Sequence, residues 1–197
     1  WLDLDEQRKT GIEARSIITG LPCIDENLCI EPGDLIILGA RPSMGKSSLA
    51  SCISRHNAIS RKKSVAYFSV EMGARTQVKR DIFAEANCSL FAFNKGILPT
   101  RDYSKLSMAA GPMSEAKIWI DSEPSITPMK IQSKCNFIKS KTGLDLIIVD
   151  YLQICRTDKK LSEKRLQVED IAQSLKDMAK YFEVPVIALS QLSRDVD

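Results

Sequence analysis

The chain has 197 residues, a formal net charge of +3 and 44% hydrophobic residues. This composition can bury one sizeable core, which excludes a disordered, collagen-like or disulfide-scaffold protein. No apolar run approaches the ~18 residues of a membrane helix, so we expect a cytoplasmic protein that does not span a membrane. The single His argues against Ser-His-Asp, Cys-His and His-rich zinc sites. The six cysteines show no C-x-x-C spacing, and we expect them to be buried thiols.

The first part of the chain differs from the rest. Residues 1–18 are charged and lack a strand pattern, so they predict a linker or docking helix. From residue 19 to 197, short apolar runs alternate with stretches of helical periodicity, as in parallel strands joined by crossover helices. The predicted fold is therefore α/β, a mostly parallel sheet with helices on both faces. The runs lie at residues 35–38, 65–68, 118–120, 146–149 and 184–189.

Two helices have recognisable ends or faces. Thr127 followed by Pro128 predicts a helix start, and Gly143 predicts its end before the next strand. A longer helix follows the strand at 146–149, and its apolar residues recur on one face. That face consists of Ile171, Leu175, Met178 and Phe182.

The sequence GARPSMGKSS at 39–48 lies between the first strand and a helix, which is the required context of a P-loop. Backbone N–H groups and the helix N-terminus would face phosphates, Lys46 would contact the β- and γ-phosphates, and Ser47 would hold Mg²⁺. Ala40 occupies the place of the first Gly, which is harmless if its φ stays negative. The predicted nucleotide contacts in this loop are Arg41, Ser43, Gly45, Lys46, Ser47 and Ser48.

Polar residues end three other strands. Asp150 follows an apolar run and is the candidate Walker B carboxylate for Mg²⁺, with a solvated strand-end Asp as the alternative. Glu71 is the candidate base that activates water, although it could be a charge at a helix N-terminus. Gln191 can donate and accept hydrogen bonds, which suits sensing of a γ-phosphate.

Four ordered motifs then carry a resemblance. The P-loop, FSVEM at 68–72, DYLQ at 150–153 and ALSQLSR at 188–194 together resemble the motor domain of DnaB-type replicative DNA helicases. The resemblance implies a RecA-like ATPase that uses ATP and Mg²⁺, forms a homo-hexameric ring and moves 5′ to 3′ along single-stranded DNA. It also implies that Arg80 reaches the nucleotide phosphates, and it supports the roles of Glu71 and Gln191.

The resemblance places several parts outside this chain. The arginine finger and a main DNA-contacting loop are expected beyond residue 197, and contacts to primase and a helicase loader are expected through other parts of the protein. We therefore expect residues 1–197 alone to have weak or no steady ATPase activity. Two alternatives stay open: a RecA-class protein that coats or remodels DNA without unwinding it, and a non-catalytic ATP-binding ring module.

The basic segment 156–165 is the candidate DNA-contacting loop. It holds five Lys or Arg and two acids, so 5 − 2 equals the whole net charge of +3. We expect Lys159 and Lys160 to contact the DNA backbone, together with Arg194. A solvated basic loop without DNA contacts is the alternative.

Overall fold

The computed structural model of the protein describes residues 16–157 and 163–192. Its centre is one five-stranded sheet in the order β1-β5-β4-β2-β3, in which every neighbouring pair is parallel. Each strand contains one of the predicted apolar runs, with small differences at the ends. The strands are β1 (Leu35–Ala40), β2 (Val65–Ser69), β3 (Ile118–Asp121), β4 (Leu146–Asp150) and β5 (Val186–Gln191).

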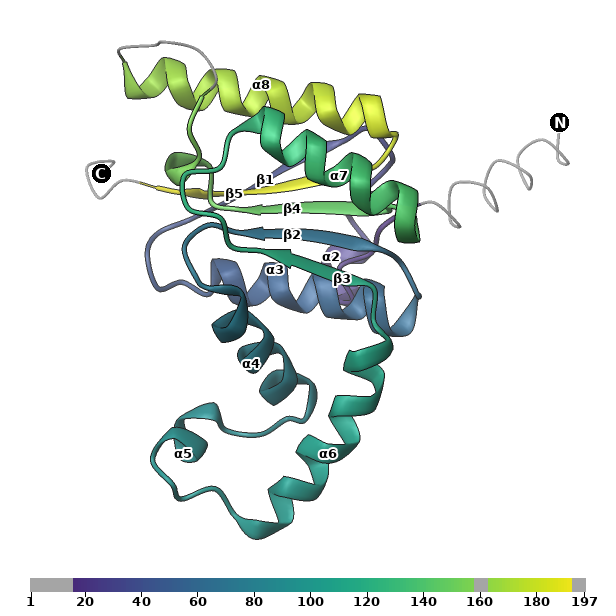
Figure 1. Ribbon diagram of the computed structural model, residues 1–197, viewed down its shortest axis with the longest axis vertical. Helices are drawn as coiled ribbons and strands as arrows, with labels where there is room; N and C mark the ends of the chain where they lie inside the picture. Colours follow the sequence, from purple (N-terminus) through teal and green to yellow (C-terminus); the bar gives the residue numbers. More distant parts are fainter. Residues whose placement is uncertain (1–15, 158–162, 193–197) are drawn as a thin grey trace, which may run out of the picture.

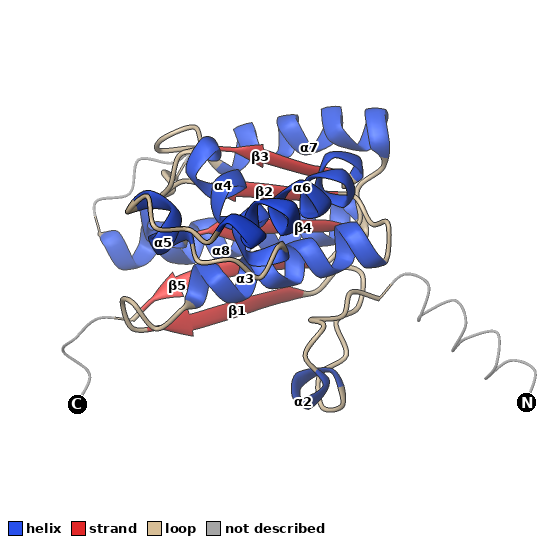
Figure 2. Ribbon diagram, turned by 90° about the horizontal axis from the view of Figure 1, so that it is seen from below, coloured by secondary structure: helices blue, strands red, loops and turns tan. Residues whose placement is uncertain are grey.

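Helices cover both faces of the sheet (Figure 1). On one face lie α7 (Pro128–Thr142) and α8 (Lys164–Phe182). On the other lies α3 (Lys46–Arg55), which continues into a π-helical turn (His56–Ser60), and α4 (Ala74–Glu85) packs against α3. Figure 2 shows α3, α4 and α6 in front of the strands. The predicted α/β class with helices on both faces is confirmed.

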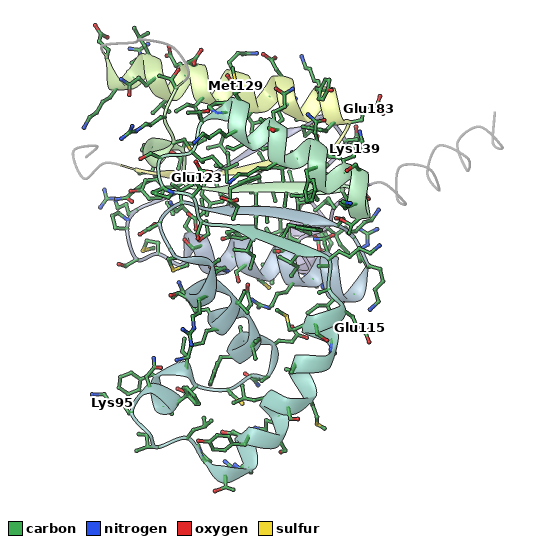
Figure 3. The ribbon with its side chains drawn as sticks, in the orientation of Figure 1. Lys95, Glu115, Glu123, Met129, Lys139 and Glu183 are labelled. Atoms are coloured by element: carbon green, nitrogen blue, oxygen red, sulfur yellow. The ribbon has the colours of Figure 1, made fainter. Side chains whose placement is uncertain are left out.

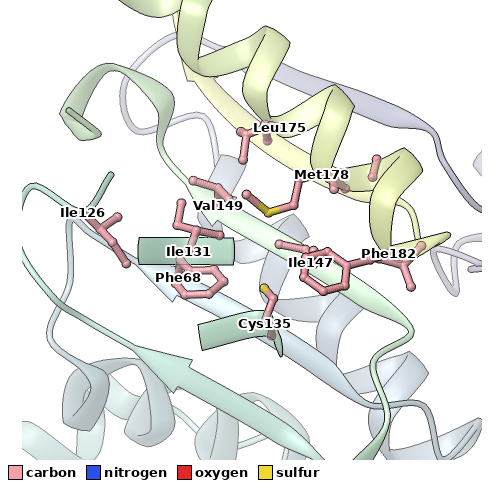
Figure 4. Packing of buried hydrophobic residues seen from close by; sticks show 14 of the residues in the cluster. Phe68, Ile126, Ile131, Cys135, Ile147, Val149, Leu175, Met178 and Phe182 are labelled. Carbon is pink, nitrogen blue, oxygen red and sulfur yellow. The ribbon is translucent and has the colours of Figure 1, made fainter. Parts of the chain in front are cut away.

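Apolar side chains fill the space between the sheet, α7 and α8 (Figure 4). The ends of α7 lie where the sequence predicted them. The Thr127 side chain accepts a hydrogen bond from the backbone of Lys130, Pro128 occupies the first turn, and Gly143 ends α7 with a φ of 79°. The predicted apolar face of α8 is buried against β4 and β5, which confirms that prediction. Its members are Ile171, Leu175, Met178 and Phe182.

The two central strands are buried on both sides. All residues of β2 and β4 are buried, because Phe68 and Val149 face α7 and α8 while Tyr67 and Ile148 face α3. Continuous apolar runs are typical of parallel strands covered on both faces. The outer strands are more open, and the side chain of Ile37 in β1 is 48% exposed.

A helical lobe extends away from the sheet and was not predicted from the sequence (Figure 1). It consists of α4, α5 (Leu90–Asn94) and α6 (Thr100–Glu115). The rings of Phe83 and Phe93 pack with centroids 5.0 Å apart, and Lys79 donates to Asn94 at 2.8 Å. Figure 3 places Lys95 at the far end of the lobe and Glu115 where α6 returns to the sheet.

The chain enters the domain through residues 16–34. Ile17 is buried and bridges to Ile30, Arg61 donates to the backbone oxygen of Ser16, and a single turn, α2 (Pro22–Asp25), follows. The division into a linker at 1–18 and an ATPase domain at 19–197 stays a prediction, because residues 1–15 lie outside the described residues. Within the described ranges, no helix is long and apolar enough to cross a membrane.

The cysteines only partly follow the sequence-based prediction. Cys135 and Cys155 are buried, and burial raises the pKa of each thiol to about 12, so both stay protonated near neutral pH. Cys23 and Cys29 are exposed, so the expectation that all six are buried is wrong. Cys23 lies in the single turn of α2 and Cys29 shortly after it, where there is little secondary structure to cover them.

Candidate functional site

The loop between β1 and α3 has the backbone geometry that a P-loop needs. Gly45 caps α3 with a φ of 86°, a conformation that favours glycine, and among the described residues no atom beyond its chain neighbours and its own helix backbone lies within 4 Å of where its Cβ would be. Ser43 also has a positive φ, of 65°. Ala40 remains within the extended strand β1, which explains why glycine is not needed there. The space beside Gly45 therefore stays open in front of the helix N-terminus.

One cavity of ≈ 540 Å³ lies at the carboxyl edge of the sheet and gathers residues from separate segments. Its lining includes every residue predicted to bind nucleotide or to catalyse, together with Met72 and Tyr151. These predicted residues are Arg41, Ser43, Gly45, Lys46, Ser47, Ser48, Glu71, Arg80 and Gln191.

Lys46 lines this cavity, and the buried Asp150, which is not itself a lining residue, lies beside it. The Lys46 Nζ lies 3.7 Å from Asp150 Oδ1, and the two side chains are only 10% and 1% exposed. Within the described part of the chain, neither of these atoms has a hydrogen-bond partner. Because burial of charge is unfavourable unless it is hydrogen-bonded, the pair is poised to gain from a polar ligand.

Two tyrosines flank this pair, and sequence analysis assigned a role to neither. Tyr67 donates its hydroxyl to Asp150 Oδ2 at 3.4 Å. Burial, then the charge of Asp150, raises the pKa of Tyr67 well above its ordinary value, so the hydroxyl remains a donor. The ring of Tyr151 lies 4.1 Å from Lys46 Nζ in a cation–π contact. A polar-tipped Tyr67 inside an otherwise apolar strand was the available signal, since buried tyrosine hydroxyls need partners.

Glu71 occupies the exposed side of the cavity, at the turn after β2. Burial, then the charges of Glu71 and Asp150, raises the pKa of Tyr151 above its ordinary value. The turn is fixed by two hydrogen bonds, from Val70 N to the backbone oxygen of Asp150 at 2.9 Å and from Ser69 Oγ to the backbone oxygen of Met72 at 2.8 Å. Glu71 can therefore face a ligand in the cavity from a fixed backbone position.

Arg80 reaches the cavity from α4. Its guanidinium donates to Met72 Sδ at 3.0 Å and to Ser48 Oγ at 3.4 Å, so it lies beside the first turn of α3. Neither contact is to a carboxylate, which leaves the charge of Arg80 available to an anion. Sequence spacing alone gave Arg80 no distinct role, and its placement depends on the position of α4.

A buried polar network fixes α4 against α3. Asp81 is 2% exposed, accepts from Ser51 and Gln77, and forms an ion pair with Arg55 at 2.9 Å. Arg55 also lies 3.6 Å from Glu85. These residues join the P-loop helix to the helix that carries Arg80, and no sequence motif pointed to them.

The residues predicted to contact DNA are not among those that the structure describes. Lys159, Lys160 and Arg194 lie outside the described residues, so their role stays a prediction. The described ends of the basic segment are fixed, since Arg156 N donates to the backbone oxygen of Ile126 at 3.0 Å and α8 begins at Lys164.

Comparison with known proteins assigns this arrangement to a family. The sequence pattern described as the DnaB-like helicase C terminal domain matches residues 16–197. The chain belongs to this family. The RecA-like fold expected from the motifs is confirmed with it.

Relatives support the assignment. The replicative DNA helicase DnaB of Geobacillus stearothermophilus is 42% identical over 187 residues, which cover 94% of this chain and 41% of that protein. The replicative DNA helicase DnaC of Bacillus subtilis (strain 168) is 41% identical over 186 residues, covering 91% and 41%. The chain thus spans about two fifths of the length of these relatives.

Two solved structures support the same assignment of family and fold. An ATPase domain of known structure matches with a TM-score of 0.87 and 27% identity, over 99% of this chain and 70% of that chain. A DnaB-like replicative helicase, described with its interactions with primase, matches with a TM-score of 0.78 and 31% identity, over 85% of this chain and 41% of that one.

Proposed function

We propose that this chain is the ATP-hydrolysing motor of a replicative DNA helicase, which uses ATP to move along single-stranded DNA and separate duplex strands. The observation that carries the proposal is the single cavity at the carboxyl edge of the sheet, where P-loop, strand-end and α4 residues meet around an unsatisfied Lys46–Asp150 pair. Family membership supports the same function, because the relatives are replicative DNA helicases.

ATP and Mg²⁺ fit the residues present. Lys46 lines the cavity and the buried Asp150 lies beside it, and neither Lys46 Nζ nor Asp150 Oδ1 has a hydrogen-bond partner among the described residues, so a cationic and an anionic group stand side by side next to the cavity. Ser47, in the first turn of α3, and Asp150 would hold Mg²⁺, Asp150 mostly through water. When bound, the metal would neutralise charge on the phosphates.

Phosphate binding follows from the P-loop geometry. The open space beside Gly45 lets the N-terminal N–H groups of α3 approach an anion, and the helix dipole favours negative charge there. Lys46 contacts the β- and γ-phosphates as a point charge, and Arg80 contributes a planar donor from the opposite wall. Arg41, Ser43 and Ser48 complete the set of contacts.

Hydrolysis requires a group that orients and deprotonates water. Glu71 is exposed in the cavity and takes this role as general base. Tyr67 holds Asp150 Oδ2, so the second carboxylate oxygen stays directed to Lys46 and the metal side of the site. Gln191, at the end of β5, contacts the γ-phosphate and senses its presence.

The other partners belong to the whole protein. We propose a homo-hexameric ring with ATP between subunits, movement from 5′ to 3′, and backbone contacts from Lys159, Lys160 and Arg194. Primase is a proposed partner because a structural neighbour is described with its primase interactions. A helicase loader is proposed on the family resemblance alone.

Glu71→Gln in the full protein that contains this chain tests the proposal. ATP turnover should fall at least about 100-fold because the general base is removed, while ATP still binds. Unwinding of a forked DNA substrate should be lost with it. The matched control Glu115→Gln changes an exposed Glu at the end of α6 and should leave both activities unchanged. Undiminished turnover in Glu71→Gln would refute the assignment of the base, and turnover without unwinding in the unaltered protein would favour a DNA-coating ATPase.

A further inference from the structure

The side chain of Gln153 pairs with the end of β5. Its Nε2 donates to the backbone oxygen of Gln191 at 3.0 Å and to Ser190 Oγ at 2.9 Å. Its Oε1 accepts from the backbone N–H of Gln191 at 3.2 Å. A carboxamide carries the same donor and acceptor as a peptide group, so Gln153 bonds Gln191 as a neighbouring strand would.

The strand pairing in the sheet explains why Gln191 needs hydrogen-bond partners from a side chain. Pairing between β1 and β5 continues to Ala40 and Gln191, but pairing between β4 and β5 ends at Val149 and Ala188. Past that point the backbone groups of Gln191 have no β4 residue opposite them. The Gln153 side chain supplies both missing hydrogen bonds and extends the sheet by one residue at its carboxyl edge.

The backbone of Gln153 is itself held in place. It belongs to a 3₁₀ turn (Leu152–Ile154). Leu152 in this turn and Cys155 just after it are only 2% and 7% exposed, in the core under α8. The next residue, Arg156, is bonded to Ile126 and opens the basic segment 156–165. Gln153 therefore lies between the buried core under α8 and the end of β5, whose Gln191 lines the cavity. Arg156, the first residue of the basic segment, follows three residues later.

We propose that Gln153 is a positioning residue that holds Gln191 in the ATP cavity. The inference rests on the proposed function. Without the Gln153 carboxamide, the backbone N–H and C=O of Gln191 lose these hydrogen bonds, and the Gln191 side chain is no longer held against the cavity.

The experiment compares Gln153→Leu and Gln153→Glu with unaltered protein, in the full protein that contains this chain. The Leu variant loses all three hydrogen bonds, whereas the Glu variant keeps an acceptor for Gln191 N but faces the Gln191 carbonyl with a carboxylate. We expect kcat for ATP to fall about tenfold in both, with KM for ATP changed less than about twofold, since phosphate contacts remain.

A matched control and a double variant separate positioning from folding. Gln173→Leu removes an exposed glutamine of α8, bonded to Asp177, and should leave kcat and KM for ATP unchanged. In a Gln191→Ala background, Gln153→Leu should lower kcat by less than about twofold, because the two residues act as a unit. If the Leu variant does not fold, the Glu variant and its Gln191→Ala double variant decide.

Two results would overturn the inference. Normal kcat in the Gln153 variants would show that the pairing has no functional role. An unchanged penalty in the Gln191→Ala background would show that Gln153 acts independently of Gln191. Absence of ATP turnover in the unaltered protein would instead overturn the proposed function, so the two failures are distinguishable.

Discussion

The middle of the sheet and its carboxyl edge are built from the same strands with opposite chemistry. In β4, Val149 is fully buried among apolar side chains, and the next residue, Asp150, is equally buried but has a carboxylate oxygen without a hydrogen-bond partner within the described ranges. In β5, Leu189 is fully buried, and Gln191 is exposed in the cavity. Within two residues, the side chains of each strand change from apolar ones packed in the core to polar ones at the proposed ligand site.

The contrast separates stability from function. Apolar side chains in the middle gain free energy from burial without any need for a ligand. Polar groups at the edge are left incompletely bonded, which is unfavourable in the protein alone and becomes favourable when a complementary ligand binds. Substitutions in the middle should therefore change folding, and those at the edge should change binding and turnover.

The largest expected effect is in the middle of the sheet. Ile147→Ala removes a fully buried side chain that contacts α7 and α8, and the free energy of unfolding should fall by about 4 kcal/mol. Denaturant unfolding monitored by circular dichroism measures it. Ile97→Ala, at a side chain 67% exposed, is the matched control and should change stability by less than about 0.5 kcal/mol. Equal losses of stability in Ile147→Ala and Ile97→Ala would contradict the claim that burial in the middle of the sheet stabilises the fold.

A smaller effect is expected in the buried polar network between α3 and α4. Asp81→Ala removes the closer carboxylate partner of Arg55, at 2.9 Å, and leaves Glu85 at 3.6 Å, so the free energy of unfolding should fall by about 3 kcal/mol. Asp81→Asn keeps an acceptor and should lose less. Since α4 carries Arg80, ATP should also bind more weakly to Asp81→Ala. Unchanged stability would mean that this network does not fix α4 to α3.

The smallest effect concerns Asp25, in the segment that enters the domain. Burial opposes ionisation, but hydrogen bonds from the Thr19 side chain and from the N–H groups of Thr19 and Gly20 outweigh it and lower the pKa of Asp25. The folded pKa lies below the unfolded value, so the ionised form stabilises the protein at and above about pH 5 and this contribution is lost as pH falls through the folded pKa.

Asp25→Asn should therefore lower the free energy of unfolding by less than about 1 kcal/mol near neutral pH. The difference from unaltered protein should shrink below about pH 4, where the Asp25 carboxyl of the unfolded chain is protonated. Urea unfolding at pH 7, 5 and 3 measures this. A difference that grows on acidification would contradict the sign of the pKa shift.

Local patterns predicted the strands and two helices. The apolar runs of β2 and β4, the cap at Thr127 and the buried face of α8 depend on neighbours in the sequence, and all three are present. The lobe of α4 to α6 was missed, because its helices carry mixed polar residues and α6 contains Gly111 and Pro112, which normally disfavour a helix interior. Packing of α4 against α3 and α6, and of α6 against the π-helical turn, overrides these preferences.

The site was predictable where one segment makes it and not where segments meet. The P-loop is a continuous motif, so Lys46 and Ser47 could be named from spacing. Tyr67, Tyr151 and Gln153 could not, because their contacts join β2 to β4, β4 to the P-loop helix and the 3₁₀ turn to β5. Such contacts depend on strand order, which the sequence alone did not specify.

Titration calorimetry with Mg²⁺ and ATP tests the central claim most directly, that the carboxyl edge of the sheet is an ATP site. The comparison is between the unaltered protein, Lys46→Ala and Lys141→Ala, whose exposed lysine lies at the last turn of α7, beyond the opposite edge of the sheet. The account predicts ATP binding in the unaltered protein and in Lys141→Ala, and binding at least about tenfold weaker in Lys46→Ala, which loses a charged contact to phosphate. Equal ATP affinity in Lys46→Ala and the unaltered protein would contradict it.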